Sequence, residues 1–237
     1  MKYSFRDING AVQTVDYENV GNKAFNVDCM VALKETPDKF YDLCICDPPY
    51  GININNNMGR RKGDKASDYK KVKWDDKPPS AEYFKELFRV SKNQIVWGAN
   101  YFTMPPTKCF IVWRKPQISE QVSFSMCEYA WASFDATSKE WIGMSAEDDR
   151  IHPTQKPVKL YEWLLTHYAK QGDKILDTHL GSGSSRIAAY NLGFDFVGYE
   201  IDKDYFNAQE ERFNKHTAQI RFFDLAPKQE TEQLQII

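Results

Sequence analysis

The sequence lacks any long apolar run. None of its hydrophobic stretches approaches the ~18 residues that a membrane-spanning helix requires. The N-terminal stretch from Met1 to Gly10 also lacks the apolar core of a secretion signal. We therefore expect a cytoplasmic protein in a reducing environment, without a membrane among its partners.

Cysteine is scarce and irregularly spaced. The chain has 5 cysteines, and this odd, scattered set argues against a disulfide framework. Cys44 and Cys46 lie in an apolar stretch, and no cluster of histidines or further cysteines is near them in the sequence. We expect them to be small buried side chains, and we expect no metal site.

An excess of one charge is missing as well. The 31 basic and 33 acidic residues leave a formal net charge of −2. If such a protein binds nucleic acid, its positive charge has to be concentrated on one face. The length of 237 residues, with 42% hydrophobic residues, fits one α/β domain with a modest insertion.

What the sequence does contain is an alternation of short apolar stretches with segments of helical periodicity. Strands are expected at residues 41–46, 94–98, 109–113, 128–134, 174–180 and 194–201, and helices at 81–90, 158–169, 184–192 and 203–215. This alternation predicts a parallel sheet covered by helices on both faces. We expect a single domain over residues 1–227 and a fraying polar tail at 228–237.

One long polar segment, residues 51–79, interrupts the alternation. Between residues 60 and 77 it holds eight Lys or Arg against four Asp, with Tyr69 and Trp74 among them. One interpretation is a solvated surface loop. The other is a DNA-contacting element, because cations neutralise phosphates and aromatic rings stack on bases. The predicted DNA-binding residues are Arg60, Arg61, Lys62, Lys70, Lys71 and Lys73.

The first chemical motif directly follows the apolar stretch at 41–46. It is the turn Asp47-Pro48-Pro49-Tyr50, whose two prolines stiffen the backbone and remove two backbone donors. The carboxylate of Asp47 and the carbonyls of Asp47 and Pro48 can then grip the hydrogens of an aromatic amine and expose its lone pair. Tyr50 can stack on a base swung out of a duplex. A plain stiff turn is the alternative to the predicted catalytic set, Asp47, Pro48, Pro49 and Tyr50.

The second motif is a glycine turn, residues 177–184, between an expected strand and an expected helix. Its glycines allow a close backbone approach, and the helix offers free amides to a ligand. Glu200 ends the next expected strand, 19 positions after Gly181. An acidic residue placed there can hold the hydroxyls of a ribose, so a nucleoside-containing cofactor fits. A tight strand-to-helix turn without a ligand is the alternative.

The third motif is the segment from His152 to Pro157, which opens the expected helix at 158–169. Prolines flank it on both sides and make it rigid. Lys156 can pair with a carboxylate, and Thr154 can cap the helix. For His152 alone, an ordinary surface or core histidine is the favoured interpretation.

Together and in this order, the motifs resemble the beta class of DNA amino-methyltransferases, which act on adenine N6 or cytosine N4. The resemblance spans about residues 26–214 and includes Trp97 to Tyr101. It implies a Rossmann-like fold with a largely parallel seven-stranded sheet, one antiparallel strand and permuted motif order. It also implies S-adenosylmethionine (SAM) as cofactor and double-stranded DNA as partner, with a homodimer as a further possibility.

The resemblance also implies roles for individual residues. Asp28 would meet the adenine amine of the cofactor and Glu200 its ribose. Lys156 and the glycine turn would surround its methionine portion. The predicted cofactor-binding set is Asp28, Lys156, Asp177, His179, Gly181, Ser182, Gly183 and Glu200.

The chain departs from the family pattern in two respects. Thr178 and His179 stand where Pro and Phe are usual, which concerns cofactor affinity. The chain also lacks room for a large recognition domain, so readout would come from residues 51–79, from 119–150, or from a second subunit. Asp47 favours adenine, since Ser is commoner there in cytosine-N4 relatives. The alternatives are cytosine-N4 transfer, an RNA target, and a silent protein that binds cofactor and DNA.

Overall fold

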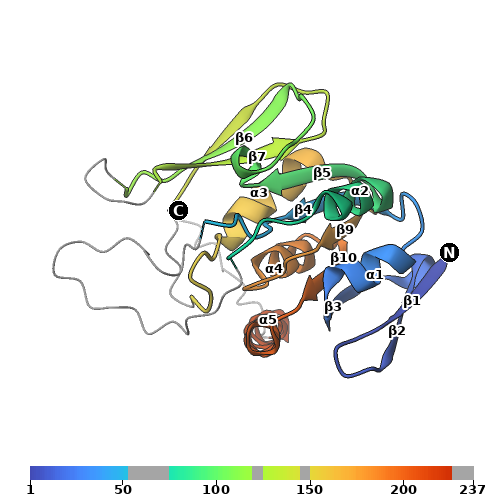
Figure 1. Cartoon of the computed structure of the whole chain (residues 1–237). Coiled ribbons are helices and arrows are strands. Elements are labelled where there is room, and N and C mark those ends of the chain that lie inside the picture. Colours follow the sequence, from blue (N-terminus) through green and yellow to red (C-terminus); the bar gives the residue numbers. More distant parts are fainter. Residues whose placement is uncertain (53–74, 119–124, 145–149, 226–237) are drawn as a thin grey trace, which may run out of the picture.

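The computed structural model describes residues 1–52, 75–118, 125–144 and 150–225. At its centre is an eight-stranded sheet (Figure 1). From one edge to the other the strands are β3 (Asn22–Asn26), β10 (Asp195–Glu200), β9 (Lys174–Asp177), β4 (Tyr41–Cys46), β5 (Ser91–Trp97), β7 (Cys127–Ala132), β6 (Cys109–Arg114) and β8 (Lys139–Ile142).

Within this sheet, β7 alone runs antiparallel to its neighbours. The α/β fold class and the single antiparallel strand are therefore confirmed. The sheet of the described residues has eight strands, however, where seven were expected. The additional strand, β8, pairs with β6 at the edge of the sheet. It has four residues with little burial, so its sequence has no apolar pattern that predicts a strand.

Helices cover both faces of the sheet, as expected. One face packs against α1 (Cys29–Glu35), α2 (Ala81–Val90) and a separate hairpin of β1 (Lys2–Arg6) and β2 (Val12–Asp16). The other packs against α3 (Val158–Tyr168) and α4 (Ser184–Asn191). The buried strand β4 contributes to both: Cys44 and Cys46 face the first core, and Leu43 and Ile45 face the second.

The best-predicted helix is α2, whose bounds match the expected 81–90. Ser80 begins it by accepting a hydrogen bond from the backbone N–H of Tyr83. The helix then buries Tyr83, Leu87 and Val90 at helical spacing. The last helix, α5 (Lys203–Leu225), extends ten residues beyond its expected end. The N-terminal elements β1, β2, β3 and α1 were not expected.

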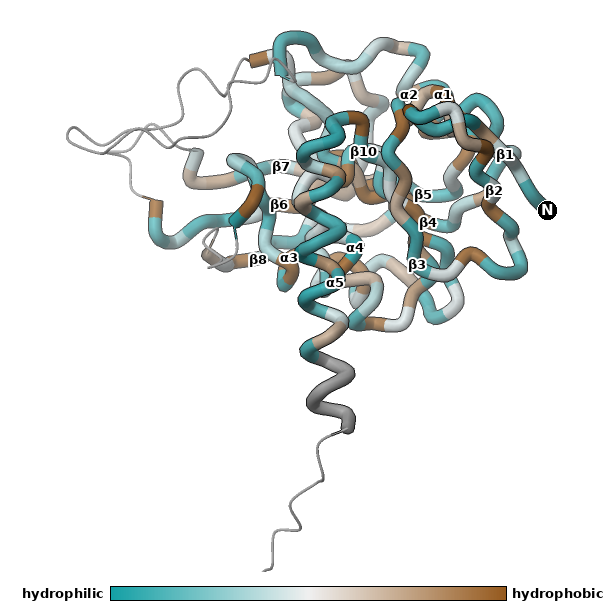
Figure 2. The backbone as a smooth tube through the Cα atoms, turned by 90° about the horizontal axis from the view of Figure 1, so that it is seen from below, coloured by the Kyte–Doolittle hydropathy of each residue, from teal (hydrophilic) through white to brown (hydrophobic). Residues whose placement is uncertain are grey.

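The hairpin of β1 and β2 lies at one end of the molecule, and strands β6 and β7 lie at the other, as Figures 1 and 2 show. The hairpin is fixed to the sheet by Tyr3, whose hydroxyl lies 2.5 Å from that of Tyr41 and 2.6 Å from that of Tyr199. No helix within the described part of the chain has the length and apolar character to cross a bilayer. Short 3-10 turns, η1 (Tyr17–Asn19) and η3 (Ala99–Tyr101), complete the fold.

Candidate active site

A cavity of about 390 Å³ lies where β4, β9 and β10 end. Ligands in open α/β sheets bind at the carboxyl ends of the strands, so this is the expected place. Parts of all three sequence motifs meet here. The walls are formed by Asp47, Pro48, Pro49, Tyr50, Asp75, Glu128, His152, Thr154, Gln155, Lys156, Tyr161, His179, Leu180, Gly181, Ser182, Glu200, Ile201, Asp202 and Tyr205.

One half of the cavity is the acceptor corner, which we define as Asp47, Tyr50, Lys156 and Glu128. Asp47 follows β4 directly, and each of its carboxylate oxygens is engaged. Oδ1 accepts a hydrogen bond of 2.5 Å from the Tyr50 hydroxyl, and Oδ2 lies 2.5 Å from the Lys156 Nζ. The Asp47 side chain remains 19% exposed, whereas that of Lys156 is 2% exposed. The Asp47 carboxylate thus faces the cavity with a buried cation behind it.

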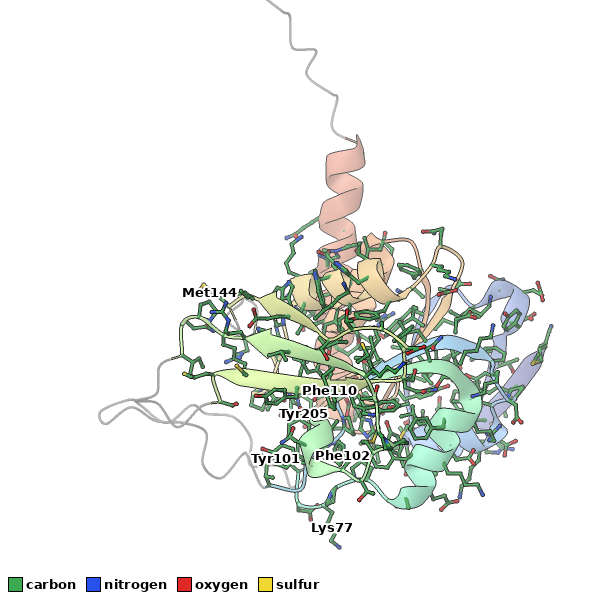
Figure 3. The ribbon with its side chains drawn as sticks, turned by 90° about the horizontal axis from the view of Figure 1, so that it is seen from above. Lys77, Tyr101, Phe102, Phe110, Met144 and Tyr205 are labelled. Atoms are coloured by element: carbon green, nitrogen blue, oxygen red, sulfur yellow. The ribbon has the colours of Figure 1, made fainter. Side chains whose placement is uncertain are left out.

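Tyr50 is held on several sides. Its backbone N–H donates to Asp75 Oδ1 at 2.6 Å, and that of Gly51 donates to the same oxygen at 2.9 Å. The Tyr50 ring stacks on Tyr101, with centroids 5.0 Å apart and planes 16° from parallel. Figure 3 shows Tyr101 and Phe102 side by side on this part of the molecule. Gly98 abuts the Tyr50 ring so closely that a Cβ there would lie 2.0 Å from Cε1.

Behind Asp47 runs a chain of alternating charges. Lys156 Nζ lies 3.0 Å from Glu128 Oε2, and Glu128 Oε1 pairs with Lys115. Burial alone would lower the pKa of Lys156, but Asp47 and Glu128 raise it above its ordinary value. Burial would likewise raise the pKa of Glu128, yet Lys156 and Lys115 hold it below its usual range. Lys156 and Glu128 are therefore both charged at neutral pH.

The other half of the cavity is lined by His179, Gly181 and Glu200, and the buried Asp177 lies next to this wall, where it accepts from the His179 N–H; we call these four residues the glycine side. The turn between β9 and α4 places Gly181 and Gly183 at positive φ, 51° and 73°. Glu200 Oε2 accepts from the Gly181 N–H at 2.8 Å, and Asp177 accepts from the Ser185 hydroxyl at 2.5 Å. Among the residues that the structure describes, neither carboxylate has an ion-pair partner.

The two carboxylates of the glycine side consequently hold protons strongly. Burial raises the pKa of Asp177 to about 7, against the opposing effect of hydrogen bonds from Ser185 and the His179 N–H. Burial also raises the pKa of Glu200, although the backbone N–H groups of Asp202 and Gly181 lower it in part. This half of the cavity is therefore suited to a ligand that brings positive charge.

A chain of hydrogen bonds positions the His179 ring in the cavity wall. The Tyr83 hydroxyl lies 2.7 Å from Thr178 Oγ1, which lies 3.0 Å from His179 Nδ1. The His179 ring also meets the Tyr83 ring edge to face, with centroids 5.3 Å apart. Burial lowers the pKa of His179 to about 4, so the ring is neutral and can act as an aromatic surface. Thr178 and His179 thus replace the family's Pro-Phe pair, and the His179 ring stands where the Phe ring would be.

His152 provides a second neutral ring. Its pKa is lowered to about 3 by burial first, and then by the charges of Lys156 and Arg150. The His152 ring lies beside that of Tyr205, with centroids 4.4 Å apart. Thr154 does not cap α3 as expected, because Pro157 is the N-cap residue and the Thr154 hydroxyl lies 3.1 Å from His152 Nδ1.

The structure brings nine of the predicted site residues to the cavity wall: Asp47, Pro48, Pro49, Tyr50, Lys156, His179, Gly181, Ser182 and Glu200. Asp177 is 2% exposed and does not line the cavity, nor does Gly183. Asp28 is exposed, caps α1 through the Met30 N–H and lies outside the wall. The six predicted DNA-binding residues lie outside the described residues.

Sequence reasoning missed Glu128, Asp75 and Tyr205. Glu128 stands near the beginning of β7, and only the antiparallel direction of this strand brings a strand's beginning to the edge where β4 and β5 end. Trp97, in the segment that resembles family sequence, is fully buried, with Lys156 Nζ 5.2 Å from its ring centroid. No cluster of three or more potential metal ligands occurs within the described ranges.

Known DNA methylases are similar to this chain in sequence. The profile of a family described as DNA methylase, acting at N6 or N4, matches residues 112–211. The type II methyltransferase M2.LlaDCHI of Lactococcus lactis subsp. cremoris is 35% identical over 83 residues, which cover 35% of this chain and only 28% of that enzyme. YubD of Escherichia coli K12, named as a methylase, is 22% identical over 207 residues, 78% of this chain and 87% of its own length.

Solved structures share the fold. The M1.HpyAVI–SAM complex superposes with a TM-score of 0.52 at 20% identity, covering 80% of this chain and 98% of that one. The cytosine-N4-specific PvuII DNA methyltransferase gives 0.53 at 13% identity, covering 84% and 92%. Motif order, sheet topology and these matches lead to one conclusion: residues 112–211 match the N6/N4 DNA methylase family, and the chain has the fold of solved DNA methyltransferases.

Proposed function

We propose that this protein transfers a methyl group from SAM to the N6 amine of adenine in double-stranded DNA. The observation that carries the proposal is the shared cavity, which Asp47 and Tyr50 line together with Gly181 and Glu200. One wall offers acceptors for an amine, and the other offers carboxylates and a glycine turn for a nucleoside.

The glycine side fits SAM by charge. The cofactor carries a positive sulfur and an ammonium group, and Asp177 and Glu200 have no cation partner among the described residues. The Glu200 carboxylate ends β10 beside the glycine turn, where it can receive ribose hydroxyls. A relative of the same fold, M1.HpyAVI, has been solved as its SAM complex, which supports the same assignment here. Asp28 would meet the adenine amine of the cofactor from the end of the neighbouring strand β3.

The acceptor corner fits the amine of a base. An aromatic amine is a weak nucleophile because its lone pair is delocalised into the ring. Asp47 and the Pro48 carbonyl would draw its two hydrogens, so that the nitrogen aligns its lone pair with the methyl group. When bound, SAM supplies a methyl group made electrophilic by its positive sulfur. Tyr50 would stack on the base after it leaves the duplex.

The choice of adenine rests on Asp47 as the first motif residue. Cytosine N4 remains the alternative from the same chemistry, since the acceptor corner would grip either exocyclic amine. The six cations Arg60, Arg61, Lys62, Lys70, Lys71 and Lys73 remain our proposed phosphate contacts, and a homodimer would enlarge the DNA-binding face.

Labelled methyl transfer tests the proposal directly. The purified protein is incubated with methyl-labelled SAM and unmethylated duplex DNA, and the DNA is digested to nucleosides. Label in N6-methyl-2′-deoxyadenosine is the expected result. Label in the N4-methylcytosine nucleoside would replace adenine by the alternative base. SAM binding without transfer to DNA or to an RNA control would overturn catalysis and favour a silent DNA-binding protein.

A further inference from the structure

The charges behind Asp47 have no role in the proposed chemistry so far. Lys156 Nζ lies between two carboxylates, 2.5 Å from Asp47 Oδ2 and 3.0 Å from Glu128 Oε2. Lys115 pairs with the other oxygen of Glu128. The charges of these side chains therefore alternate in sign, from Asp47 at the cavity through Lys156 and Glu128 to Lys115. Lys156 can stay paired with either carboxylate.

This arrangement answers a physical problem at Asp47. Both of its oxygens already accept from protein donors, Tyr50 on one side and Lys156 on the other. A target amine needs one of these oxygens. If Lys156 had Asp47 as its sole partner, freeing Asp47 would strand a buried ammonium, because the Lys156 side chain is 2% exposed and water cannot replace the carboxylate.

We propose that Glu128, oriented by Lys115, is a positioning residue that holds Lys156 and thereby frees Asp47 to accept the target amine. The inference rests on the proposed function and deepens it. Lys156 acts through Asp47 in this scheme: its hydrogens point at the two carboxylates, with the Tyr50 hydroxyl 3.5 Å from its Nζ.

The topology of the sheet makes the arrangement possible. Glu128 pairs in register with Trp113, one strand position before the end of β6, and the Lys115 N–H donates to the Met126 carbonyl just beyond. Because β7 is antiparallel, Glu128 comes to the same edge as the end of β4, which carries Asp47. A parallel strand at this place would present its last residues there instead.

The test compares Glu128→Gln with Glu140→Gln. The control removes the same charge from the edge strand β8, on the far side of β6, where Glu140 is 45% exposed and pairs with Arg114 at 2.8 Å. In Glu128→Gln, Lys156 keeps Asp47 as its one anionic partner, so kcat for methyl transfer should fall about tenfold to a hundredfold. The affinities for SAM and for DNA, measured by calorimetry and by DNA titration, should stay within about twofold of the control.

A second comparison covers the case in which Glu128→Gln does not fold. Lys156→Met alone is compared with the double variant Glu128→Gln/Lys156→Met, which buries no unbalanced ammonium at position 156. If Glu128 acts through Lys156, the two variants should have equal kcat values. A double variant slower than Lys156→Met would overturn the inference, because Glu128 would then act by another route.

The remaining outcomes separate the inference from the proposed function. A wild-type protein without transfer to DNA contradicts the proposed function itself. An active wild type with Glu128→Gln as fast as Glu140→Gln contradicts the positioning role alone. A loss of SAM affinity in Glu128→Gln equal to its loss of kcat/KM would also overturn it, since Glu128 would then support cofactor binding.

Discussion

The two halves of the cavity handle buried charge in opposite ways. In the acceptor corner, Asp47 and Glu128 are paired with Lys156, and Lys115 completes the chain. On the glycine side, Asp177 and Glu200 rely on hydroxyl and backbone donors, with no ion pair to either among the described residues. One half is electrostatically complete within the protein, and the other gains its counter-charge from a ligand.

This difference separates the kinds of defect that substitutions should cause. Changes in the acceptor corner should lower kcat, because in the proposed function this preorganised half acts on the target amine. Changes on the glycine side should lower affinity for SAM, because this half is completed by the cofactor. A substitution in the acceptor corner that lowered only SAM affinity, or one on the glycine side that lowered only kcat, would contradict this division.

The largest effect is expected for Asp47→Ala. Without the carboxylate the amine loses an acceptor that strengthens as its nitrogen attacks, so transfer should fall by at least about a thousandfold. Affinity for SAM should persist, since Lys156 retains Glu128 as a partner and the glycine side is untouched. Asp38→Ala, which removes an exposed carboxylate 2.7 Å from Arg89, is the control. A fully active Asp47→Ala enzyme would remove the basis for the proposed function.

Gly98→Ala should produce the next largest effect. The new Cβ would lie 2.0 Å from Tyr50 Cε1, so the ring must leave its place between Gly98 and Tyr101. We expect kcat to fall about a hundredfold while SAM affinity changes little. Gly21→Ala is the matched control, because Gly21 has nearly the same φ, +65° against +68°, and nothing within 4 Å. Equal losses in the two variants would show that backbone strain, and not the Tyr50 ring, is responsible.

The two halves also differ in how far the sequence alone could define them. Asp47 and Gly181 each follow a parallel strand, and the carboxyl ends of parallel strands meet at one edge, so their meeting could be predicted. Glu128 could not be found in this way, since it stands at the beginning of an antiparallel strand. Its partnership with Lys156 spans 28 positions in sequence and depends on the register of β7 with β6.

Elsewhere in the fold, predictability followed the strength of the local pattern. Helix α2 has a cap at Ser80 and a clear apolar stripe, and its bounds were predicted correctly. The hairpin strands β1 and β2 have five residues each and β8 has four, so even the alternation of β1, which buries Tyr3 and Phe5, is too short to predict a strand from the sequence. The hairpin forms because Tyr3 and Phe5 find partners far away in the chain, which no local window contains.

A tenfold effect is expected from pH on the glycine side. The pKa of Asp177 is raised from 3.8 to about 7, so the folded protein without ligand holds a proton there that the unfolded chain releases. This contribution favours the folded state below about pH 4 and is lost as pH rises towards 7. A cationic ligand prefers the ionised carboxylate, so SAM affinity should rise about tenfold from pH 6 to pH 8.

Asp177→Asn isolates that effect from Glu200 and from the titration of SAM itself. The variant should bind SAM more weakly at pH 8 and should lose the part of the pH dependence that Asp177 supplies. Calorimetry at pH 6, 7 and 8 on both proteins measures the ratio of affinities. A ratio that stays constant with pH would show that Asp177 does not change its charge in this range.

The smallest effect is expected for Tyr83→Phe, which tests how Thr178 and His179 replace the family's Pro-Phe pair. The variant removes the buried hydroxyl that lies 2.7 Å from Thr178 Oγ1, at a cost of about 1 kcal/mol in unfolding free energy. Because the His179 ring is then less firmly oriented, SAM affinity should fall about threefold, with kcat unchanged. Tyr129→Phe, which removes an exposed hydroxyl on β7, is the control. If Tyr83→Phe lowered the unfolding free energy but left SAM affinity intact, the hydrogen-bonded chain would support the fold alone, and the neutral His179 ring would hold its place through its edge-to-face contact with the ring of residue 83.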